Sequence, residues 1–302
     1  MVKCVSVIIP AFEVGQDIVK SVESALNQLD VQVEVIVVDN GGNIAMMKYL
    51  SDHYQNLRIV KQPIRGAGAA RNMGVKFASF EIIAFLDAGD VWKPNKLSVQ
   101  LNPPPDLNEV SGCYAAFQLK NGKRIGTSVR TDSDQEATDI AFKALGVPAI
   151  TSSWCLTRST FQLLGGFDLS FQNAQDLELL NRLMQIGGKI TIHRTELVDY
   201  RLDSKSLTIS HYRRQFLSAE YIRLRCNQRI SSNLTLQKFL EVSGRFPSKL
   251  WFTVHAGRLF RLALLKYGDG AYLHSLTFLM IALILDPVKF LKKMLNQSLL
   301  LR

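Results

Sequence analysis

The first third of the chain alternates short apolar runs with segments whose apolar residues recur every three or four positions. Apolar runs predict strands buried on both faces, and the helical spacing predicts helices between them. Strands that alternate with helices indicate an α/β fold with a mostly parallel sheet. The predicted strands cover residues 5–9, 33–38, 58–60 and 82–86, and the predicted helices cover residues 18–26, 44–50 and 67–78.

The middle of the chain has a less regular pattern. Residues 112–119 and 124–129 predict a hairpin, because the Asn-Gly pair at 121–122 favours a tight turn. The polar and acidic residues 131–139 predict a loop. Further on, a glycine-rich turn precedes a predicted helix over residues 174–186.

The last third predicts helices over residues 210–229, 236–242, 249–266 and 271–285. The last of these runs is almost entirely apolar. As a helix it would be only ~22 Å long, which is shorter than the ~30 Å hydrocarbon core of a bilayer. We therefore expect two parts, residues 1–209 and residues 210–302, and no spanning helix in the second.

Composition and charge narrow the class of protein. Of the 302 residues, 47% are hydrophobic and 21% are charged, which is typical of a globular chain. Residues 1–199 hold 19 Lys and Arg against 21 Asp and Glu, a net charge of −2, whereas residues 200–302 hold 17 against 5, a net charge of +12. The excess positive charge therefore lies in the last third.

The basic tail carries no zinc-ligand spacing and no nucleic-acid-binding signature, so we expect no nucleic acid partner. Basic residues interleaved with apolar helix faces favour an anionic membrane surface. The alternative is a helical subdomain that packs on the rest of the chain with its charges in water. We expect a cytoplasmic protein, peripheral on the cytoplasmic face of the membrane. The pattern does not predict an oligomeric state.

Cysteine spacing and the N-terminus agree with a cytoplasmic protein. The four cysteines lie far apart, without metal-ligand or redox spacing, and are expected to be free thiols in a reducing compartment. The apolar run at residues 5–9 is short and ends at Pro10, so it does not resemble a signal peptide. The cysteines are Cys4, Cys113, Cys155 and Cys226.

Small and acidic residues follow three of the predicted strands, at positions 10–13, 39–42 and 87–90. Carboxyl ends of parallel strands meet at one edge of the sheet, where open α/β sheets bind their ligands. Asp87 and Asp90 at such an edge would suit a divalent cation or a ribose. The alternative is that Asp-Ala-Gly-Asp is only a turn, since these residues are common turn formers.

Taken in order, these segments resemble the family-2 glycosyltransferases, which are inverting enzymes with the GT-A fold. The similarity covers residues 4–210. It implies a Rossmann-like, mostly parallel sheet flanked by helices in residues 1–209, and it leaves residues 210–302 as a C-terminal helical region, which we expect to be membrane-associated. The matching segments are Val5–Phe12, Glu34–Gly41, Gly66–Gly74, Phe85–Leu97, Gly165–Asp168, Gln175-Asp176, and Tyr200-Arg201 with Ser206 and Thr208.

The resemblance implies the transfer of a sugar from a nucleotide-sugar donor to a hydroxyl of a glycan or lipid-linked acceptor, in cell-surface polysaccharide biosynthesis. It implies that Asp176 is the catalytic base. Apart from the resemblance, the alternative for Asp176 is an aspartate in the first turn of a helix that complements the helix dipole. The alternative for Arg71 is a surface arginine on a helix. The residues implied in donor binding are Pro10, Ala11, Phe12, Glu13, Asp39, Asn40, Gly68, Arg71 and Asp87.

The resemblance also implies a divalent metal, Mg²⁺ or Mn²⁺, with Asp87 as a ligand. Asp90 would substitute for a usual carboxylate one residue earlier, and Asp203, which lies near the place of a family histidine, would add a further oxygen ligand. The chain departs from the family pattern at three further positions. Gly89 stands where a second metal-binding carboxylate is usual, Gln175 replaces an acidic residue before the base, and Asn40 replaces an aspartate. The metal site is therefore either rearranged or eroded, and an eroded site would leave the enzyme metal-independent or inactive.

Two other functions remain as alternatives. A non-catalytic relative that binds nucleotide or glycan as a scaffold is favoured by Gly89 and Gln175 and opposed by Asp87 and Asp176. A pyrophosphorylase-like nucleotidyltransferase would need a glycine-rich loop with a lysine after the first strand. That loop here is Ala-Phe-Glu-Val-Gly at residues 11–15, which disfavours this class.

Overall fold

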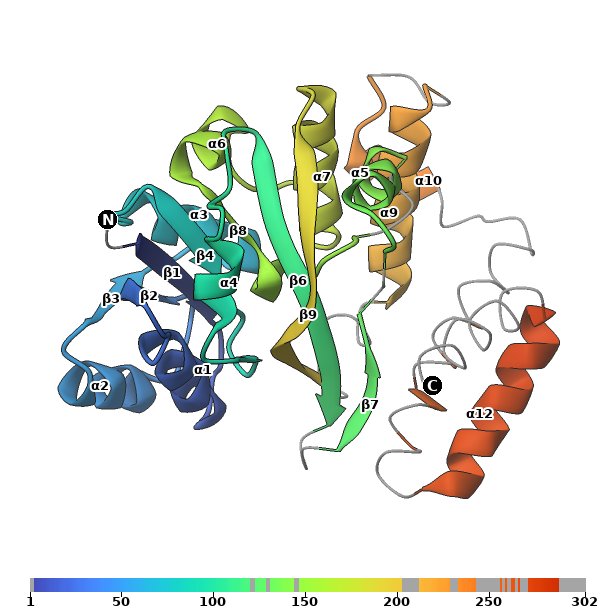
Figure 1. The fold of residues 1–302 in the computed structure, drawn as a ribbon. Helices are drawn as coiled ribbons and strands as arrows, with labels where there is room; N and C mark the ends of the chain where they lie inside the picture. The colour runs from blue at the N-terminus through green and yellow to red at the C-terminus, as the bar shows by residue number, and fades with distance from the viewer. Residues whose placement is uncertain are drawn as a thin grey trace. The chain divides into compact units, whose positions relative to one another are not determined.

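The computed structural model describes residues 3–119, 123–128, 131–143, 147–202, 212–228, 233–242 and 271–287, together with 256, 259, 262, 263 and 266. The first third is the predicted alternation of strands and helices, coloured blue to teal in Figure 1. Its elements are β1 (Lys3–Ala11), α1 (Asp17–Leu26), β2 (Val31–Asp39), α2 (Ile44–His53), β3 (Leu57–Lys61), α3 (Ala67–Lys76) and β4 (Ile82–Phe85).

The rest of the structure adds shorter strands, two long strands and more helices. The middle elements are β5 (Val91–Trp92), α4 (Lys96–Gln100), β6 (Glu109–Leu119), β7 (Arg124–Thr127), α5 (Asp134–Phe142), a 3₁₀ turn η1 (Thr151–Ser153), β8 (Cys155–Thr157), α6 (Arg158–Leu163), α7 (Gln175–Gln185) and β9 (Lys189–Leu202). The described helices of the last third are α9 (Tyr212–Cys226), α10 (Leu236–Val242) and α12 (Tyr272–Leu285).

Among the described residues, nine strands form one mixed sheet. Its order is β3-β2-β1-β4-β8-β6-β9-β5, and β7 pairs with β6. β1 runs parallel to β2 and β4, and β2 runs parallel to β3, whereas β8 is antiparallel to β4 and β6. The predicted parallel α/β core is thus confirmed, and antiparallel strands extend it.

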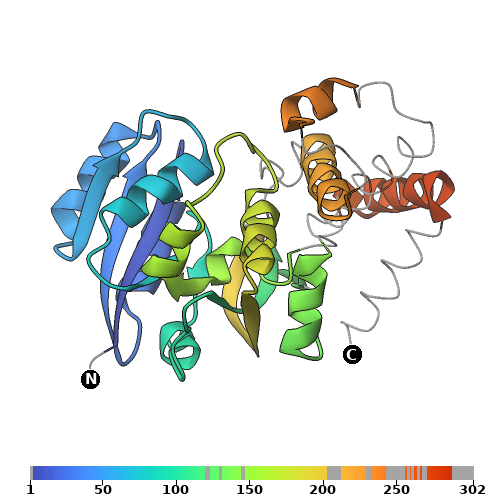
Figure 2. The same cartoon turned by 90° about the horizontal axis from the view of Figure 1, so that it is seen from above.

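Helices cover both faces of the parallel part of the sheet. α1 and α2 lie on one face and α3 on the other, as Figures 1 and 2 show from two directions. This is the arrangement that right-handed crossovers produce when the strand order reverses at β1. Gly74 lets α3 approach the sheet closely, because a Cβ atom there would lie 2.4 Å from Cγ2 of Ile8.

The hydrophobic core also contains a buried lysine. Lys96 is fully buried, and its Nζ atom lies 3.8 Å from the ring centroid of Trp92. Burial lowers the pKa of Lys96 to about 8, because a charged ammonium loses its hydration there. The ring face of Trp92 compensates for part of that loss, since it attracts a cation.

The structure corrects the expectation of a loop at residues 131–139. Residues 134–142 form α5, whose N-cap Ser133 accepts a hydrogen bond from the Glu136 amide, while the Glu136 carboxylate accepts one from the Asp132 amide. This arrangement starts the helix and resembles a capping box, except that Glu136 accepts from the amide one residue before the N-cap. Ala137 and Ala141, one turn apart, bury its inner face. A polar composition concealed a helix with a narrow apolar side.

The other predicted elements are found with small shifts at their ends. The hairpin is β6 and β7, although the turn at residues 120–122 lies outside the described residues. Of the tail, α9, α10 and α12 correspond to three predicted helices. Most of residues 249–266 and all of residues 288–302 lie outside the described residues. The hydrophobic pattern did not predict β5, α6 or the fourteen-residue β9.

The chain forms two compact units. One comprises residues 1–116 and 128–200, and the other comprises 117–127 and 201–302. The second unit thus includes a segment from the middle of the sequence, which a linear boundary at 209/210 does not predict. In this unit Ile125, Leu202 and Leu262 pack against one hydrophobic cluster.

Candidate active site

The carboxyl ends of three parallel strands meet at one edge of the sheet. Ala11 at the end of β1 pairs in register with Asp39 at the end of β2, and Ile8 pairs with Phe85 at the end of β4. The loops that follow these strands therefore begin at the same edge. Three groups of the predicted site residues lie there, at 10–13, at 39–40 and at 87.

The loop after β2 is held by side chains of its own two polar residues. Oδ1 of Asp39 accepts hydrogen bonds from the amides of Gly41 at 3.2 Å and Gly42 at 2.7 Å. Asn40 is buried and bonds at both ends of its amide. Its Nδ2 donates to the carbonyls of Gln62 at 2.8 Å and Ile64 at 2.6 Å, and its Oδ1 accepts from the Gly66 amide at 2.7 Å.

These contacts give Asp39 and Asn40 different positions in the site. Asp39 is only partly buried. Asn40 uses both of its amide hydrogens and its carbonyl oxygen to connect the end of β2 to the segment that leads into α3. A contact between Asn40 and a nucleobase stays a prediction, and its visible role is to shape the loop.

The loop after β1 carries an exposed aromatic ring. Pro10 and Ala11 are the last two residues of β1, and Phe12 beyond them is 47% exposed. The guanidinium of Arg65 lies 5.4 Å from the centroid of the Phe12 ring. Glu13 is exposed and adopts a left-handed φ of 47°, which turns the chain back toward α1. The sequence did not single out Arg65.

Arg71 and Asp87 form the central ion pair of the site. Nη2 of Arg71, from α3, lies 2.5 Å from Oδ1 of Asp87 in the loop after β4. The arginine side chain is 7% exposed and the aspartate side chain 37%. Arg71 also lies over the Phe167 ring, 5.3 Å from its centroid, and its Nε is buried without a hydrogen-bond partner. Arg71 is therefore no surface arginine.

Asp176 is the second residue of α7 and is partly buried. Burial raises the pKa of its carboxyl. The Leu177 amide, which donates to Oδ1 at 2.8 Å, and the positive charge of Arg71 oppose the shift, whereas the negative charge of Asp87 adds to it. These interactions connect Asp176, Arg71 and Asp87 electrostatically.

The start of α7 packs against the start of α3 at Gly68. A Cβ atom on Gly68 would lie 2.7 Å from Nε2 of Gln175 and 2.8 Å from its Oε1. Nε2 of Gln175 also donates to the Phe171 carbonyl. A glutamate at 175 has no hydrogen to donate there. Gly68 and Gln175 therefore fix the turn of helix that carries Asp176.

Asn72 holds the glycine-rich turn before α7 against α3. Its Nδ2 donates to the Phe167 carbonyl and its Oδ1 accepts from the Phe167 amide, both at 2.8 Å. Gly166 has a left-handed φ of 74°, and a Cβ atom there would lie 2.7 Å from Oδ1 of Asn72. The sequence offered only the adjacency of Asn72 to Arg71 as a signal for this role.

Asp90 is a buried residue at the end of the loop that follows β4. Its Oδ2 accepts a hydrogen bond from Oγ of Ser152 at 2.5 Å, and its carbonyl accepts one from Oγ of Ser21 at 2.7 Å. Oγ of Ser152 in turn accepts from the Asp87 amide at 3.1 Å. In this arrangement the Asp90 carboxylate braces the loop, and only 4% of the residue is exposed.

The described carboxylates of Asp87 and Asp90 each contact a protein side chain. The first carboxylate pairs with Arg71 and the second with Ser152. No group of three or more His, Cys, Asp or Glu side chains among the described residues is placed to hold a metal. Asp203, the third predicted ligand, lies outside the described residues, as do Ser206 and Thr208 of the segment expected to close the site. The metal set stays a prediction.

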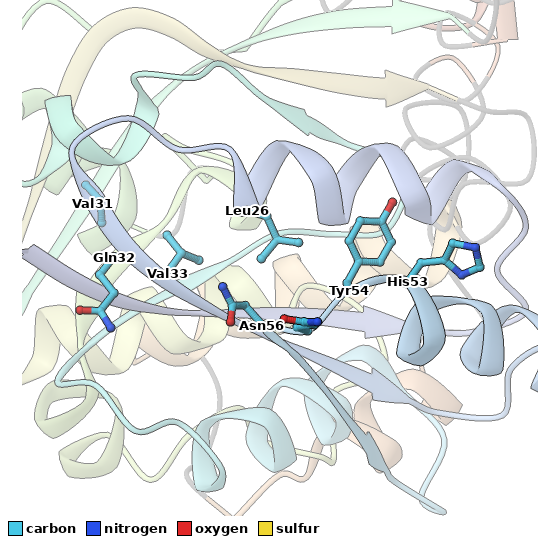
Figure 3. A pocket seen from close by; sticks show the side chains of 8 residues that line it. Leu26, Val31, Gln32, Val33, His53, Tyr54 and Asn56 are labelled. Atoms are coloured by element: carbon cyan, nitrogen blue, oxygen red, sulfur yellow. The ribbon is translucent and has the colours of Figure 1, made fainter.

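A separate cleft of about 520 Å³ opens at the opposite edge of the sheet. Figure 3 shows its side chains, which come from the ends of α1 and α2, the start of β2 and the chain between α2 and β3. The cleft lies at the amino end of β2, away from the loops that carry Asp39 and Asp87. Its described lining is Leu26, Val31, Gln32, Val33, His53, Tyr54, Gln55 and Asn56, none of them a predicted site residue.

The sequence of the chain matches a known protein family. The model of glycosyl transferase family 2 matches residues 6–158, which is half of the sequence. The chain belongs to glycosyl transferase family 2. The match includes the three strand ends and the Arg71–Asp87 pair, and it stops before the turn and helix that carry Asp176.

Curated relatives of this family-2 protein align over part of their length. It is 29% identical to the uncharacterized glycosyltransferase YibD of Escherichia coli K12 over 42% of this chain and 38% of that protein. It is 26% identical to Escherichia coli chondroitin synthase over 62% of this chain and 27% of the synthase. The chain thus spans less than half the length of these two relatives.

A third relative is similar over a comparable stretch. It is the Escherichia coli UDP-Glc:alpha-D-GlcNAc-diphosphoundecaprenol beta-1,3-glucosyltransferase WfgD, which is 31% identical over 40% of this chain and 48% of that protein. Among solved structures, residues 1–349 of S. aureus TarS in complex with UDP superpose with a TM-score of 0.56 at 15% identity. That match covers 90% of this chain and 88% of the TarS chain, and it confirms the predicted GT-A fold.

Proposed function

We propose that this protein is an inverting glycosyltransferase. It transfers a sugar from a nucleotide-sugar donor to a hydroxyl of a glycan or lipid-linked acceptor in cell-surface polysaccharide synthesis. The observation that carries the proposal is the linked set of Asp176, Arg71 and Asp87. It joins a carboxyl whose pKa is raised by burial to a buried arginine and a half-exposed carboxylate at the ligand-binding edge of the sheet.

Asp176 serves as the base in this mechanism. The acceptor hydroxyl gives its proton to the Asp176 carboxylate, and its oxygen forms a bond to the anomeric carbon. The bond between that carbon and the diphosphate oxygen breaks on the opposite face, which inverts the carbon and releases a nucleoside diphosphate. A raised pKa suits a base, because a more basic carboxylate takes up the acceptor proton more readily.

Arg71 and Asp87 act on the donor. The charge of Arg71 acts on the Asp176 carboxyl, and its buried guanidinium meets the developing charge of the leaving diphosphate. Asp87 contacts Arg71 through Oδ1, and its Oδ2 accepts a hydrogen bond from a ribose hydroxyl of the donor. Phe12, Asp39 and the surrounding loop form the wall for the nucleobase. This mechanism assigns no step to a metal.

The class of substrate rests on the relatives. WfgD is named for a UDP-glucose donor and a lipid-diphosphate acceptor, chondroitin synthase for a polysaccharide product, and the TarS structure contains UDP. These names support a nucleoside diphosphate sugar as donor and a glycan or lipid-linked acceptor for this chain.

The substitution Asp176→Asn tests the proposal. It removes the base but keeps the shape of the side chain, so turnover of a nucleotide sugar should fall ~10²–10⁴-fold. Calorimetry should show unchanged binding of UDP. Asp168→Asn is the matched control, because Asp168 is an exposed carboxylate in the preceding turn, and it should keep wild-type turnover.

The pH profile adds a second criterion. Asp176 must be deprotonated to accept a proton, so kcat/KM should fall as the pH drops through its pKa, which lies above the ordinary 3.8. The Asn variant should lose this limb of the profile. Turnover by Asp176→Asn above a third of wild type would refute the base assignment. Donor binding without turnover of any sugar in the wild type would instead favour a scaffold protein.

A further inference from the structure

Helix α12 presents a broad apolar face to solvent. Leu273 is 81% exposed, Ile284 75%, Leu276 58% and Met280 51%. Spacings of three, four and seven residues place these side chains on one side of the helix. Residues 272–285 contain no charged side chain. A soluble surface helix ordinarily carries its charged residues on this side.

The opposite side of α12 holds the helix against its own unit through small residues. Ser275 and Ala282, two turns apart, are its buried residues. Oγ of Ser275 donates to the Ala263 carbonyl at 2.9 Å, and the Ala271 amide donates to the Lys266 carbonyl at 2.8 Å. Since the anchoring side is already used, the leucine and isoleucine side is available for an external partner.

We propose that α12 lies in the surface of an anionic membrane, with its exposed apolar side inserted among the acyl chains. Fourteen residues make a helix ~21 Å long, which is too short to cross a hydrocarbon core of ~30 Å. Among the described helices, none combines the length and apolarity needed to span a bilayer. The helix therefore lies along the surface.

The positive charge of the surrounding sequence favours an anionic membrane as the partner of this apolar face. Residues 200–302 carry a net charge of +12, and Lys289, Lys292 and Lys293 follow the helix within eight residues of its end. Positive charge beside an inserted apolar helix is attracted by anionic headgroups. A second copy of the chain would bring another +12 against the first, which opposes self-association through this face. The inference does not depend on the transferase chemistry.

Vesicle flotation of the full chain tests the proposal. The protein is mixed at low salt with vesicles of phosphatidylcholine and phosphatidylglycerol, or of phosphatidylcholine alone. It should float with the anionic vesicles and far less with the neutral ones. Salt at 1 M, where the screening length is ~3 Å, should weaken binding without abolishing it, because the apolar insertion remains.

The double variant Leu273→Glu/Ile284→Glu identifies the contact. Its partition into anionic vesicles should fall at least tenfold, because two carboxylates replace the two most exposed apolar side chains of α12. Leu163→Glu in α6 is the matched control, since Leu163 is 62% exposed, and it should float like wild type. Both positions are exposed, so circular dichroism and melting should match wild type and exclude misfolding.

Three outcomes overturn the proposal. The wild-type protein fails to float with anionic vesicles, or the double variant floats as well as wild type. In the third outcome, sedimentation shows a wild-type dimer and a monomeric double variant, and neither binds vesicles. The face would then be an interface between copies. Donor turnover measured without vesicles stays a separate readout of the proposed function.

Discussion

At the scale of single residues, Asn40 shows how a departure from the family pattern is built into the structure. Its two amide hydrogens go to the carbonyls of Gln62 and Ile64, and its oxygen receives the Gly66 amide. An aspartate, the usual residue of the family, would face two carbonyl oxygens with an oxygen of its own. The conformation of residues 62–66 is therefore matched to asparagine.

The substitution Asn40→Asp should destabilise the protein although it restores the family residue. Two buried hydrogen bonds are lost and an oxygen is placed against two acceptors, so the free energy of unfolding should drop by roughly 1–3 kcal/mol. Thermal melting measures the loss. Asn43→Asp is the control, because exposed Asn43 caps α2 by accepting from the Met46 amide, and aspartate caps equally well. Equal melting of both variants would show that the loop adapts.

Residue chemistry explains which site members the sequence could predict. Asp39, Asp87 and Asp176 stand in a recognisable order relative to strands and turns, and the structure brings Asp39 and Asp87 to one edge. Asn72 and Ser152 act through partners 95 and 62 to 65 residues away. Local patterns carry no signal for such contacts. Asp90 was predicted as a metal ligand for its position near Asp87, and that role stays a prediction, whereas its hydrogen bond with Ser152 depends on the tertiary fold.

At the scale of elements, the parallel core was predictable because buried parallel strands consist of continuous apolar residues. The elements that escaped prediction lack such runs. α5 has a polar surface and only two buried alanines on its inner face, so its capping residues were the informative signal. β9 mixes apolar, basic and acidic residues along its fourteen positions and is only partly buried over much of its length.

The contact between α3 and α7 gives a prediction at this scale. In Gly68→Ala the added methyl group would lie 2.7 Å from the present position of Nε2 of Gln175. The Gln175 amide would have to move away, which would break its hydrogen bond to the Phe171 carbonyl. Asp176 is the next residue, and misplacement of a catalytic group can cost ~10² in rate. We expect kcat to fall at least about tenfold. Melting should be unchanged, since alanine favours a helix by up to about 1 kcal/mol over glycine.

A double variant separates this contact from other effects. Gly68→Ala/Gln175→Ala removes the overlap, so it should recover part of the rate lost in Gly68→Ala, whereas independent effects would simply add. Gly15→Ala is the control, because nothing lies within 4 Å of a Cβ atom at Gly15. A normal kcat in Gly68→Ala would contradict the view that this contact positions Asp176.

At the scale of the whole molecule, the chain does not divide at one point in the sequence. Residues 117–127 belong to the same compact unit as residues 201–302. Ile125 on β7 and Leu202 at the end of β9 pack against the cluster that also contacts Leu262. The basic tail therefore contributes to folding through segments that come from the catalytic part of the sequence.

Deletion of residues 203–302 should expose Ile125 and Leu202 to water. Burial of such side chains contributes about 1.5–3 kcal/mol each when complete, and both are partly buried, so we expect a loss of roughly 2–4 kcal/mol. Differential scanning fluorimetry should show a lower melting temperature, and a dye that binds exposed apolar surface should fluoresce more strongly. Ile125→Thr/Leu202→Thr in the shortened chain is the matched variant. It should reduce dye binding without restoring the melting temperature, because the lost packing is not replaced. If residues 1–202 instead melt like the full chain and bind no dye, the tail is an independent attachment, and the division at 200/201 has no energetic meaning.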